Sequence, residues 1–579
     1  MSRNTFVTKK YWAMLGGGTI SCFIVSLLLL SDFVVAGIFL GGTAIAGVNL
    51  VSPIYSLSMF VGLVFSIGIP ILYSRAVGNF QREEADRCFG LGLTSTVAVG
   101  LLLFVVLFFT GDSYIRFYDV SPEISSQASA YFSWMRLTIM LLPVTTFLSD
   151  MIFVDGDEIL STAAGITEAV VNIVASILLC RRIGIAGVGL GSVIGQLASL
   201  AVCLLHFTRD SNTLRPNLYF SWKKLISVVR YSMMDAGTYL FIALFTAFAN
   251  KYLVWRFGPD TVAMVAVITF VKDLQLAFDG IGIAIQPIIS TYLAEKCYDG
   301  VRKIWKLGKI TALAEGFLAA AALFFLAPVL PGVLGFTDAK TVTMAVTGLR
   351  ILSFSLPFMS LLYLITSYYL LADRIALGVV ICALRDVVLA VPLILLLGGP
   401  FGMSGVFVAA ALSPAAAWLL SMLWVCLRMG RENWPLLLKD RESLVREKLF
   451  EFTVSPAEII QVRNRVEAML RDEGVPRESV ARCLLVFEET FMMICDGNPG
   501  ATVRAECVIV LEQDRIRLIG RDDGRPLDLS DADSAPDSFR AYTLSRFTSQ
   551  KMFSAVHMMA VSFNRNMFEM VLTEKKAHE

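Results

Sequence analysis

Long apolar stretches dominate the first part of the chain, and short polar segments separate them. Crossing the hydrocarbon core of a bilayer, about 30 Å thick, takes about 20 predominantly apolar residues in a helix. Runs of this kind recur from Tyr11 to about Leu427. They predict twelve transmembrane helices, at residues 11–39, 45–73, 88–110, 126–152, 160–180, 185–207, 230–255, 261–290, 310–331, 345–371, 375–397 and 402–427.

The pattern changes after Trp434, where charged residues become frequent and long apolar runs stop. Residues 431–448 are expected to form a juxtamembrane linker, and residues 449–579 a separate domain. Its expected order is a strand at 449–454, helices at 456–473 and 478–495, strands at 504–513 and 515–521, and a final helix and strand pair ending near Leu572. The predicted fold class is therefore an all-α polytopic membrane protein with a small C-terminal α+β sandwich domain.

The two halves of the apolar region share distinctive residues at a nearly constant offset. The pairs are Gly41 with Gly258, Pro70 with Pro287, and Gly187 with Gly405, separated by 217, 217 and 218 residues. An offset held across six helices indicates a duplicated six-helix unit. We expect an N-lobe at 1–218 and a C-lobe at 219–430, related by a pseudo-twofold axis along the membrane normal. Such repeats are typical of transporters that alternate between two access states.

Composition narrows the function classes. The chain is 56% hydrophobic and only 17% charged, too few charges for a water-soluble surface, and its net charge of +1 gives no reason to expect a nucleic-acid partner. The ten cysteines are scattered singly, as expected for small apolar residues in a reducing compartment. Of the three histidines, His206, His557 and His578, two lie in the tail, so a histidine-based metal or triad site inside the membrane is not expected.

The distribution of positive charge predicts the orientation. Arg3, Lys9 and Lys10 precede the first apolar run, which has no small-residue cleavage site and therefore resembles an uncleaved first span. Lysine and arginine are concentrated in the connections on the same side as the N-terminus. By the positive-inside rule both termini face the cytoplasm, and the expected location is the plasma membrane.

Several segments between residues 11 and 427 resemble the multidrug and toxic compound extrusion (MATE) family. They are Asp32 to Val48, Gly68 to Arg87, Asn172 to Ser192, Gln286 to Ser290, and Leu384-Arg385 leading to Val391-Pro392-Leu393. The resemblance implies a twelve-helix transporter that exports cationic or amphipathic drugs in exchange for protons or sodium ions, with no other cofactor. Many members carry an aspartate four residues after the helix-five asparagine, whereas here Asn172 is followed by Ser176. The identity of the coupling ion therefore stays open.

Asp32 is the first candidate for ion coupling. It stands in an otherwise uncharged stretch from Tyr11 to Arg75, and it matches the family's helix-one aspartate. An ionisable group in the membrane needs a partner, water or a function, and burial disfavours the charged form of a carboxyl group. The alternative is a structural carboxylate bonded to neighbouring hydroxyls. Asn172 and Glu168 complete the candidate group; Glu168 either replaces the missing aspartate or lines the cavity without titrating.

Further charges lie in the predicted C-lobe spans. Lys272, Asp273 and Asp279 fall in the span 261–290, where seven residues separate Lys272 from Asp279 and place both on one helix face. Arg385 and Asp386 fall in the span 375–397. Each group either contacts a cationic substrate or forms a structural ion pair. Arg385 matches a family arginine, so for this residue a lobe-stabilising or gating role stands beside substrate contact.

Two more charged residues belong to the predicted span 230–255. Asp235 and Lys251 stand near its two ends. We expect both at the membrane interface, with the lysine reaching toward water.

The tail resembles the ATP-binding domain of the histidine-kinase and anti-sigma-factor superfamily. The matching segments are Glu488-Glu489, Asp522-Asp523-Gly524, Pro526-Leu527-Asp528 and Asn566. Glu489, Asp522 and Gly524 are thus the candidate nucleotide-binding residues. The family's magnesium-binding asparagine is replaced by Met493, and no glycine follows Gly524 to let backbone amides approach phosphates. We expect weak or absent binding of ATP and magnesium and no catalysis.

Three functions remain open, none of them enzymatic. The first is a secondary active exporter of cationic or amphipathic small molecules with a cytoplasmic regulatory domain. The second is a membrane sensor whose anti-sigma-like tail binds a cytoplasmic protein. The third is a flippase for a lipid-linked precursor, which would be expected to show more cavity arginines than Arg385 and Arg350.

Overall fold

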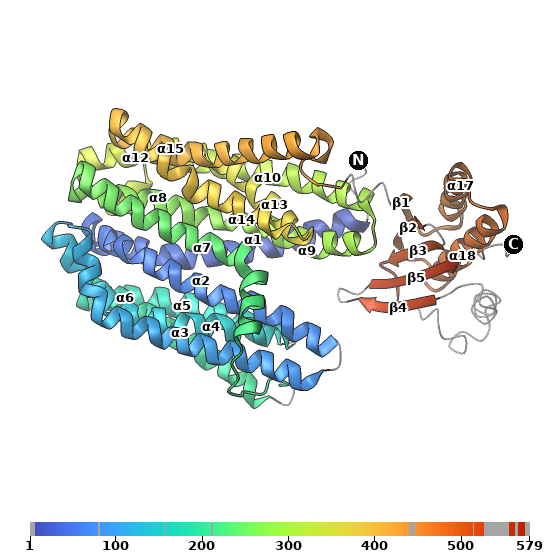
Figure 1. Ribbon diagram of the computed structural model, residues 1–579, viewed down its shortest axis with the longest axis horizontal. Helices are drawn as coiled ribbons and strands as arrows, with labels where there is room; N and C mark the ends of the chain where they lie inside the picture. Colours follow the sequence, from blue (N-terminus) through green and yellow to red (C-terminus); the bar gives the residue numbers. More distant parts are fainter. Residues whose placement is uncertain are drawn as a thin grey trace. The chain divides into compact units, whose positions relative to one another are not determined.

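The computed structural model describes residues 6–78, 81–155, 157–209, 212–438, 446–512, 515–525, 555–561 and 565–573. The chain divides into two compact units (Figure 1). The helical unit comprises Gly18–Gly282 and Thr311–Leu423. The tail unit comprises Met1–Gly17, Ile283–Ile310 and Trp424–Glu579.

Six long helices form the first half. They are α1 (Phe6–Leu40), α2 (Gly42–Gly78), α3 (Arg82–Phe117), α4 (Pro122–Val154), α5 (Glu158–Ile183) and α6 (Ile185–Leu205). Local signals fix several ends. The side chains of Ser121 and Asp157 accept the backbone N–H groups that begin α4 and α5, and glycines with positive φ, Gly41 and Gly184, separate α1 from α2 and α5 from α6. These helices match the six predicted for the N-lobe.

The helices of the second half are interrupted more often. Its helices are α7 (Trp222–Phe257), α8 (Val262–Gln275), α9 (Asp279–Ala294), α10 (Tyr298–Leu326), α11 (Leu330–Val333), α12 (Ala339–Ser353), α13 (Leu356–Leu371), α14 (Ile375–Ala383) and α15 (Ala390–Met429). Short 3₁₀ turns are η1 (His206–Thr208), η2 (Pro259–Thr261), η3 (Leu276–Phe278) and η5 (Arg431–Asn433), and η4 (Leu384–Val388) is a π-helical turn.

Some predicted spans are interrupted. The span 261–290 consists of α8 and α9 with η3 between them, and α12 bends by 45° into α13. Among the described residues eight helices are long and apolar enough to cross a bilayer, or nine if the bent pair counts as one. The chain is therefore a multi-pass membrane protein, and the full count of twelve spans stays a prediction.

The repeat found in the sequence also has a backbone counterpart. Gly184 has φ 65° and ψ −145°, and Gly402, 218 residues later, has φ 60° and ψ −145°. Three residues further on, a Cβ atom on Gly187 or Gly405 would overlap the backbone carbonyl of Leu179 or Leu397. A left-handed residue followed by a close backbone approach requires glycine at both positions. The two halves thus reuse one helix-to-helix connection.

We expect Gly187→Ala to destabilise the helical unit. The added methyl group overlaps the Leu179 carbonyl, and overpacking of this kind costs about 1–3 kcal/mol. Gly165→Ala on α5 is the matched control, since a Cβ there meets nothing within 4 Å. Thermal unfolding in detergent measures both. Equal melting temperatures for the two variants would contradict the close approach.

In its described residues, the tail domain is a five-stranded antiparallel sheet with two helices. Its elements are β1 (Arg446–Thr453), α17 (Pro456–Asp472), α18 (Arg477–Asp496), β2 (Arg504–Glu512), β3 (Arg515–Asp522), β4 (Ala555–Val561) and β5 (Arg565–Thr573), with strand order β1-β2-β3-β5-β4. An aromatic cluster of Phe452, Phe487, Phe491 and Phe568 packs between sheet and helices. The predicted order of elements agrees, except that the predicted final helix falls in 526–554, outside the described residues.

Candidate functional site

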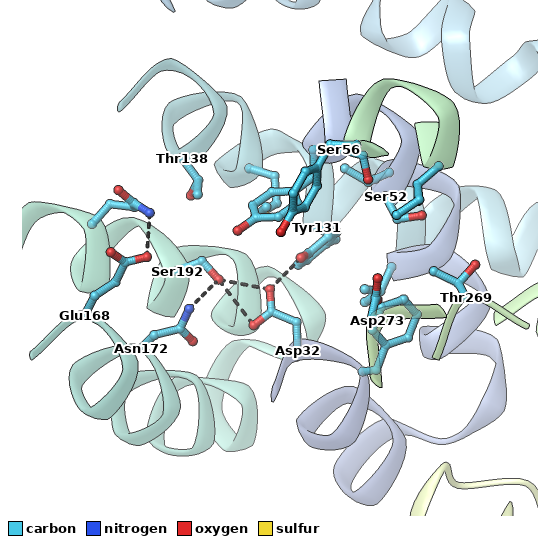
Figure 2. Close-up of a pocket in the computed structure, with 18 residues that line it drawn as sticks. Asp32, Ser52, Ser56, Tyr131, Thr138, Glu168, Asn172, Ser192, Thr269 and Asp273 are labelled. Carbon is cyan, nitrogen blue, oxygen red and sulfur yellow. Dashed lines mark hydrogen bonds between the residues drawn. The ribbon is translucent and has the colours of Figure 1, made fainter. Parts of the chain in front are cut away.

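Asp32 lies at the centre of a polar cluster built by four helices. Tyr131 on α4 donates a hydrogen bond to Asp32 Oδ2 over 2.6 Å, and Ser192 on α6 donates to the same oxygen over 3.0 Å. Asn172 on α5 donates to Ser192 Oγ over 3.3 Å (Figure 2). Ser176 donates to Asn172 Oδ1 over 3.2 Å. Among the described residues, the donors to the carboxylate come from α4 and α6 and are neutral hydroxyl groups.

Glu168 sits at the other side of the same cavity. Gln196 on α6 donates to Glu168 Oε1 over 2.7 Å, and Thr145 on α4 donates to Gln196 Oε1 over 2.5 Å. Figure 2 shows Glu168 and Asn172 projecting from α5 toward the region that holds Asp32. The three predicted coupling residues, Asp32, Asn172 and Glu168, thus line one cavity.

This Asp32 cavity has a volume of about 60 Å³ and takes residues from both halves of the chain. Its polar lining includes Tyr55 and Ser56 from α2, Tyr239 from α7, and Asp273 from α8. Of the predicted C-lobe charges, Asp273 is the one that reaches this cavity. The lining thus carries three carboxyl groups, and its described residues include no lysine or arginine.

Lys272, Arg385 and Asp386 form a separate ionic cluster. Lys272 Nζ lies 2.7 Å from Asp386 Oδ1, and Arg385 Nη2 lies 2.6 Å from Asp386 Oδ2. Arg385 and Asp386 are adjacent in the π-helical turn η4, whose wider turn changes the direction of the side chains from that of a regular α-helix. Their side chains are 1% and 2% exposed. Two cations therefore share one buried anion.

The predicted common face of Lys272 and Asp279 is not continuous. The 3₁₀ turn η3 interrupts the α-helical hydrogen-bonding pattern between these two residues. Lys272 pairs with Asp386. Asp279 instead lines a second cavity of about 270 Å³ together with Asp235, Tyr363 and Arg385. The sequence periodicity assumed an unbroken helix, so it could not predict this separation.

Asp235 lines the cavity of Asp279 and Arg385. It is also the first residue of the apolar span Asp235–Phe257 on α7, and its location at the membrane interface stays a prediction. Lys251, near the other end of α7, donates to the carbonyl of Phe117 at the end of α3.

The candidate residues of the tail are partly engaged in local structure. Asp522 ends β3 and is fully buried, and its Oδ1 accepts the backbone N–H of Gly524 over 2.9 Å. This bond closes a tight turn of the type that aspartate commonly makes. Glu489 lies on α18, and Met493, one turn later, is buried in the domain. Asn566 pairs with Asp522 in the sheet register.

Sequence reasoning missed the neutral partners of Asp32. Tyr131 and Ser192 carry no charge, and hydroxyl groups are common in apolar helices. Gln196 could have been found, because it is the one side-chain amide in the predicted span 185–207 and a buried amide requires a partner. Among the described residues, no group of three or more His, Cys, Asp or Glu side chains has an arrangement suited to a metal ion.

The helical unit, with its long apolar helices around buried carboxylates, has a membrane-transporter fold. More specifically, it is the fold of the MATE transporters. A solved inward-facing multidrug resistance MATE family transporter of the MOP superfamily matches with a TM-score of 0.64 at 16% identity, covering 70% of this chain and 94% of that one. The outward-facing form matches with a TM-score of 0.60 at 16% identity, covering 74% and 96%.

Sequence comparison finds similarity to proteins of the same family. The MatE family model matches residues 19–178. The multidrug export protein MepA of Staphylococcus saprophyticus is 21% identical over 427 residues, which is 71% of this chain and 90% of that protein. MepA of Staphylococcus aureus is 20% identical over 414 residues, or 70% and 88%. MATE transporters are not enzymes, and this chain is accordingly not an enzyme.

Proposed function

We propose that this chain is a secondary active exporter of cationic or amphipathic small molecules, driven by a proton or sodium gradient. Asp32 carries the proposal. Its side chain is buried at 9% exposure, and its described hydrogen-bond donors, Tyr131 and Ser192, are neutral hydroxyl groups. A buried carboxylate without a compensating cation is costly. The site therefore favours a bound proton or metal cation, which is what a coupling site requires.

Neutralising Asp32 changes the bonds between three helices. The carboxylate on α1 accepts from α4 and α6, whereas the protonated acid can donate one hydrogen bond. The two forms thus favour different arrangements of these helices. Because a ligand shifts a conformational equilibrium only by its differential affinity for the two states, this difference supplies the coupling in an alternating-access cycle.

The lining of the Asp32 cavity supports a cationic substrate. Asp32, Glu168 and Asp273 supply negative charge, and Tyr55 and Tyr239 supply aromatic faces that attract organic cations. The printed names of the relatives, multidrug export proteins, agree with this substrate class. A flippase for a lipid-linked precursor has less support, because the buried Arg385 is already paired with Asp386.

Transport by the purified chain in proteoliposomes tests the proposal. We expect at least one dye of a cationic panel to move about tenfold faster under an imposed proton or sodium gradient than without one. Applying the two gradients separately identifies the coupling ion. Equal rates with and without both gradients, for every dye of the panel, would contradict the proposal.

The tail completes the proposal as a cytoplasmic regulatory module of the histidine-kinase ATPase type that does not turn over nucleotide. The positive charge of the connections supports cytoplasmic termini and a plasma-membrane location. The engagement of Asp522 by Gly524 supports a structural role for the motif. The rival sensor function predicts a specific cytoplasmic protein captured by the full chain, and dye transport that responds to neither gradient.

A further inference from the structure

Strands β2 and β3 of the tail sheet are buried on both faces. In β2, Cys507 and Ile509 point into the core under α17 and α18, and the alternating residues Val508 and Val510 are also fully buried. Their cross-strand neighbour Ile519 is 1% exposed. Side chains alternate between the two faces of a strand, so a second layer must cover the face that α17 and α18 leave open.

That second layer includes the corner between α9 and α10, residues 292–303. Tyr292 Oη donates to Glu506 over 2.9 Å, and Lys296 Nζ lies 2.7 Å from Glu512. The backbone N–H of Asp299 donates to Glu447 over 2.8 Å. The tail thus bonds the last turn of α9, the connection and the first turn of α10.

Two ion pairs of the same corner reinforce these bonds. Lys303 on α10 pairs with Glu451 on β1. Arg521 on β3 pairs with both Glu295 and Glu506, and the three side chains are 9%, 6% and 2% exposed. Removing one partner from such a buried group leaves an uncompensated charge, which strongly destabilises the contact. The contact therefore depends on each of these three charged side chains.

We propose that the tail is an intramolecular clamp that holds the α9–α10 corner and thereby slows the access change of the transporter. α9 begins at Asp279, which lines the cavity of Arg385, and ends at Ala294, directly before Glu295. The 3₁₀ turn η3 interrupts the helix directly before α9 and can act as its hinge. One rigid sheet bonds both helices of the corner, so a rotation of α9 against α10 must break these bonds. Release of the tail therefore speeds transport.

Lys303→Glu tests the clamp in the full-length chain. The substitution repels Glu451 but changes no residue between β1 and β5, so the core between the sheet and its two helices, α17 and α18, stays intact. We expect the initial rate of gradient-driven dye transport in proteoliposomes to rise about threefold. Glu295→Arg, which repels Arg521, is a second release variant with the same expectation. The buried thiol of Cys297, inside the corner, reports docking directly, because release makes it accessible to maleimide labelling located by mass spectrometry.

Two further variants separate docking from a general charge effect. Lys306→Glu makes the same charge change at an exposed position one turn later on α10, and its transport rate should equal that of the wild type. The exchanged pair Lys303→Glu with Glu451→Lys should return both the rate and the Cys297 labelling to wild-type values. Greater labelling of Cys297 without a faster rate, or a slower rate, overturns the clamp. An inactive wild type would instead contradict the transporter function on which this inference rests.

Discussion

Asp32→Asn stops gradient-driven export and leaves the protein folded. The amide keeps the size of the carboxyl group and can still accept from Tyr131 and Ser192, but it can neither take up a proton nor attract a cation. We expect the initial rate of dye transport under the effective gradient to fall about tenfold or more. Proteoliposome transport measures the rate, and thermal unfolding in detergent confirms the fold.

Ser192→Ala is the control for this experiment. It removes one hydrogen bond to Asp32 and retains the ionisable group, so transport should slow less than in Asp32→Asn and should still respond to the gradient. An Asp32→Asn protein that transports at the wild-type rate, with the wild-type response to the gradient, would remove Asp32 from the mechanism.

Asp386→Asn is expected to cause the largest loss of stability. Asp386 is the anion that both Lys272 and Arg385 contact, and the latter pair is 1–2% exposed. Without it two cations remain buried next to each other, and breaking a buried ion pair from one side costs roughly 3–5 kcal/mol. Thermal unfolding and the yield of folded protein in detergent measure the effect.

Asp112→Asn gives a matched comparison for this prediction. Asp112 is 75% exposed and lies 3.5 Å from Arg136, so its loss should change stability by less than about 1 kcal/mol. Adding Lys272→Met to Asp386→Asn removes one of the two unpaired cations and should recover part of the stability. No recovery, or equal effects of Asp386→Asn and Asp112→Asn, would contradict the ionic cluster.

Sequence patterns predicted the membrane elements well where helices are continuous. The six helices of the first half follow their apolar runs, and Gly184 and Gly402, which are 218 residues apart, have matching backbone conformations. The interruptions were not predictable, because neither η3 nor η4 contains a proline or glycine. Packing against neighbouring helices, which no local pattern contains, decides those positions.

The sequence predicted those parts of the candidate site that depend on charged residues. A lone acid in an apolar span marks Asp32, and Glu168 and Asn172 follow from their position one helical turn apart. The partners Tyr131 and Ser192 lie 99 and 160 residues from Asp32, and their hydroxyl groups give no signal of their own. Likewise, Lys272 and Asp386 are 114 residues apart, and the break after Gln275 changes which faces meet.

In the tail, too, local sequence signals predict the helices and strands, whereas contacts between residues far apart in the sequence could not be predicted. Ser455 and Pro456 mark the start of α17, and alternating apolar residues mark β1. The burial of Val508 and Val510 on the second face was implicit in the continuous apolar run of β2, a pattern typical of a strand covered on both sides. What covers it could not be read from the sequence, since Tyr292 and Glu506 are 214 residues apart.

The displacement of ions by substrate tests the central claim most directly. Purified protein in weakly buffered detergent receives the transported dye, while a pH indicator and a sodium electrode record what is released. The account predicts release of protons or sodium ions by the wild type and no release by Asp32→Asn, although the variant still binds dye. Equal release from both proteins would contradict the role of this buried carboxylate as the coupling site.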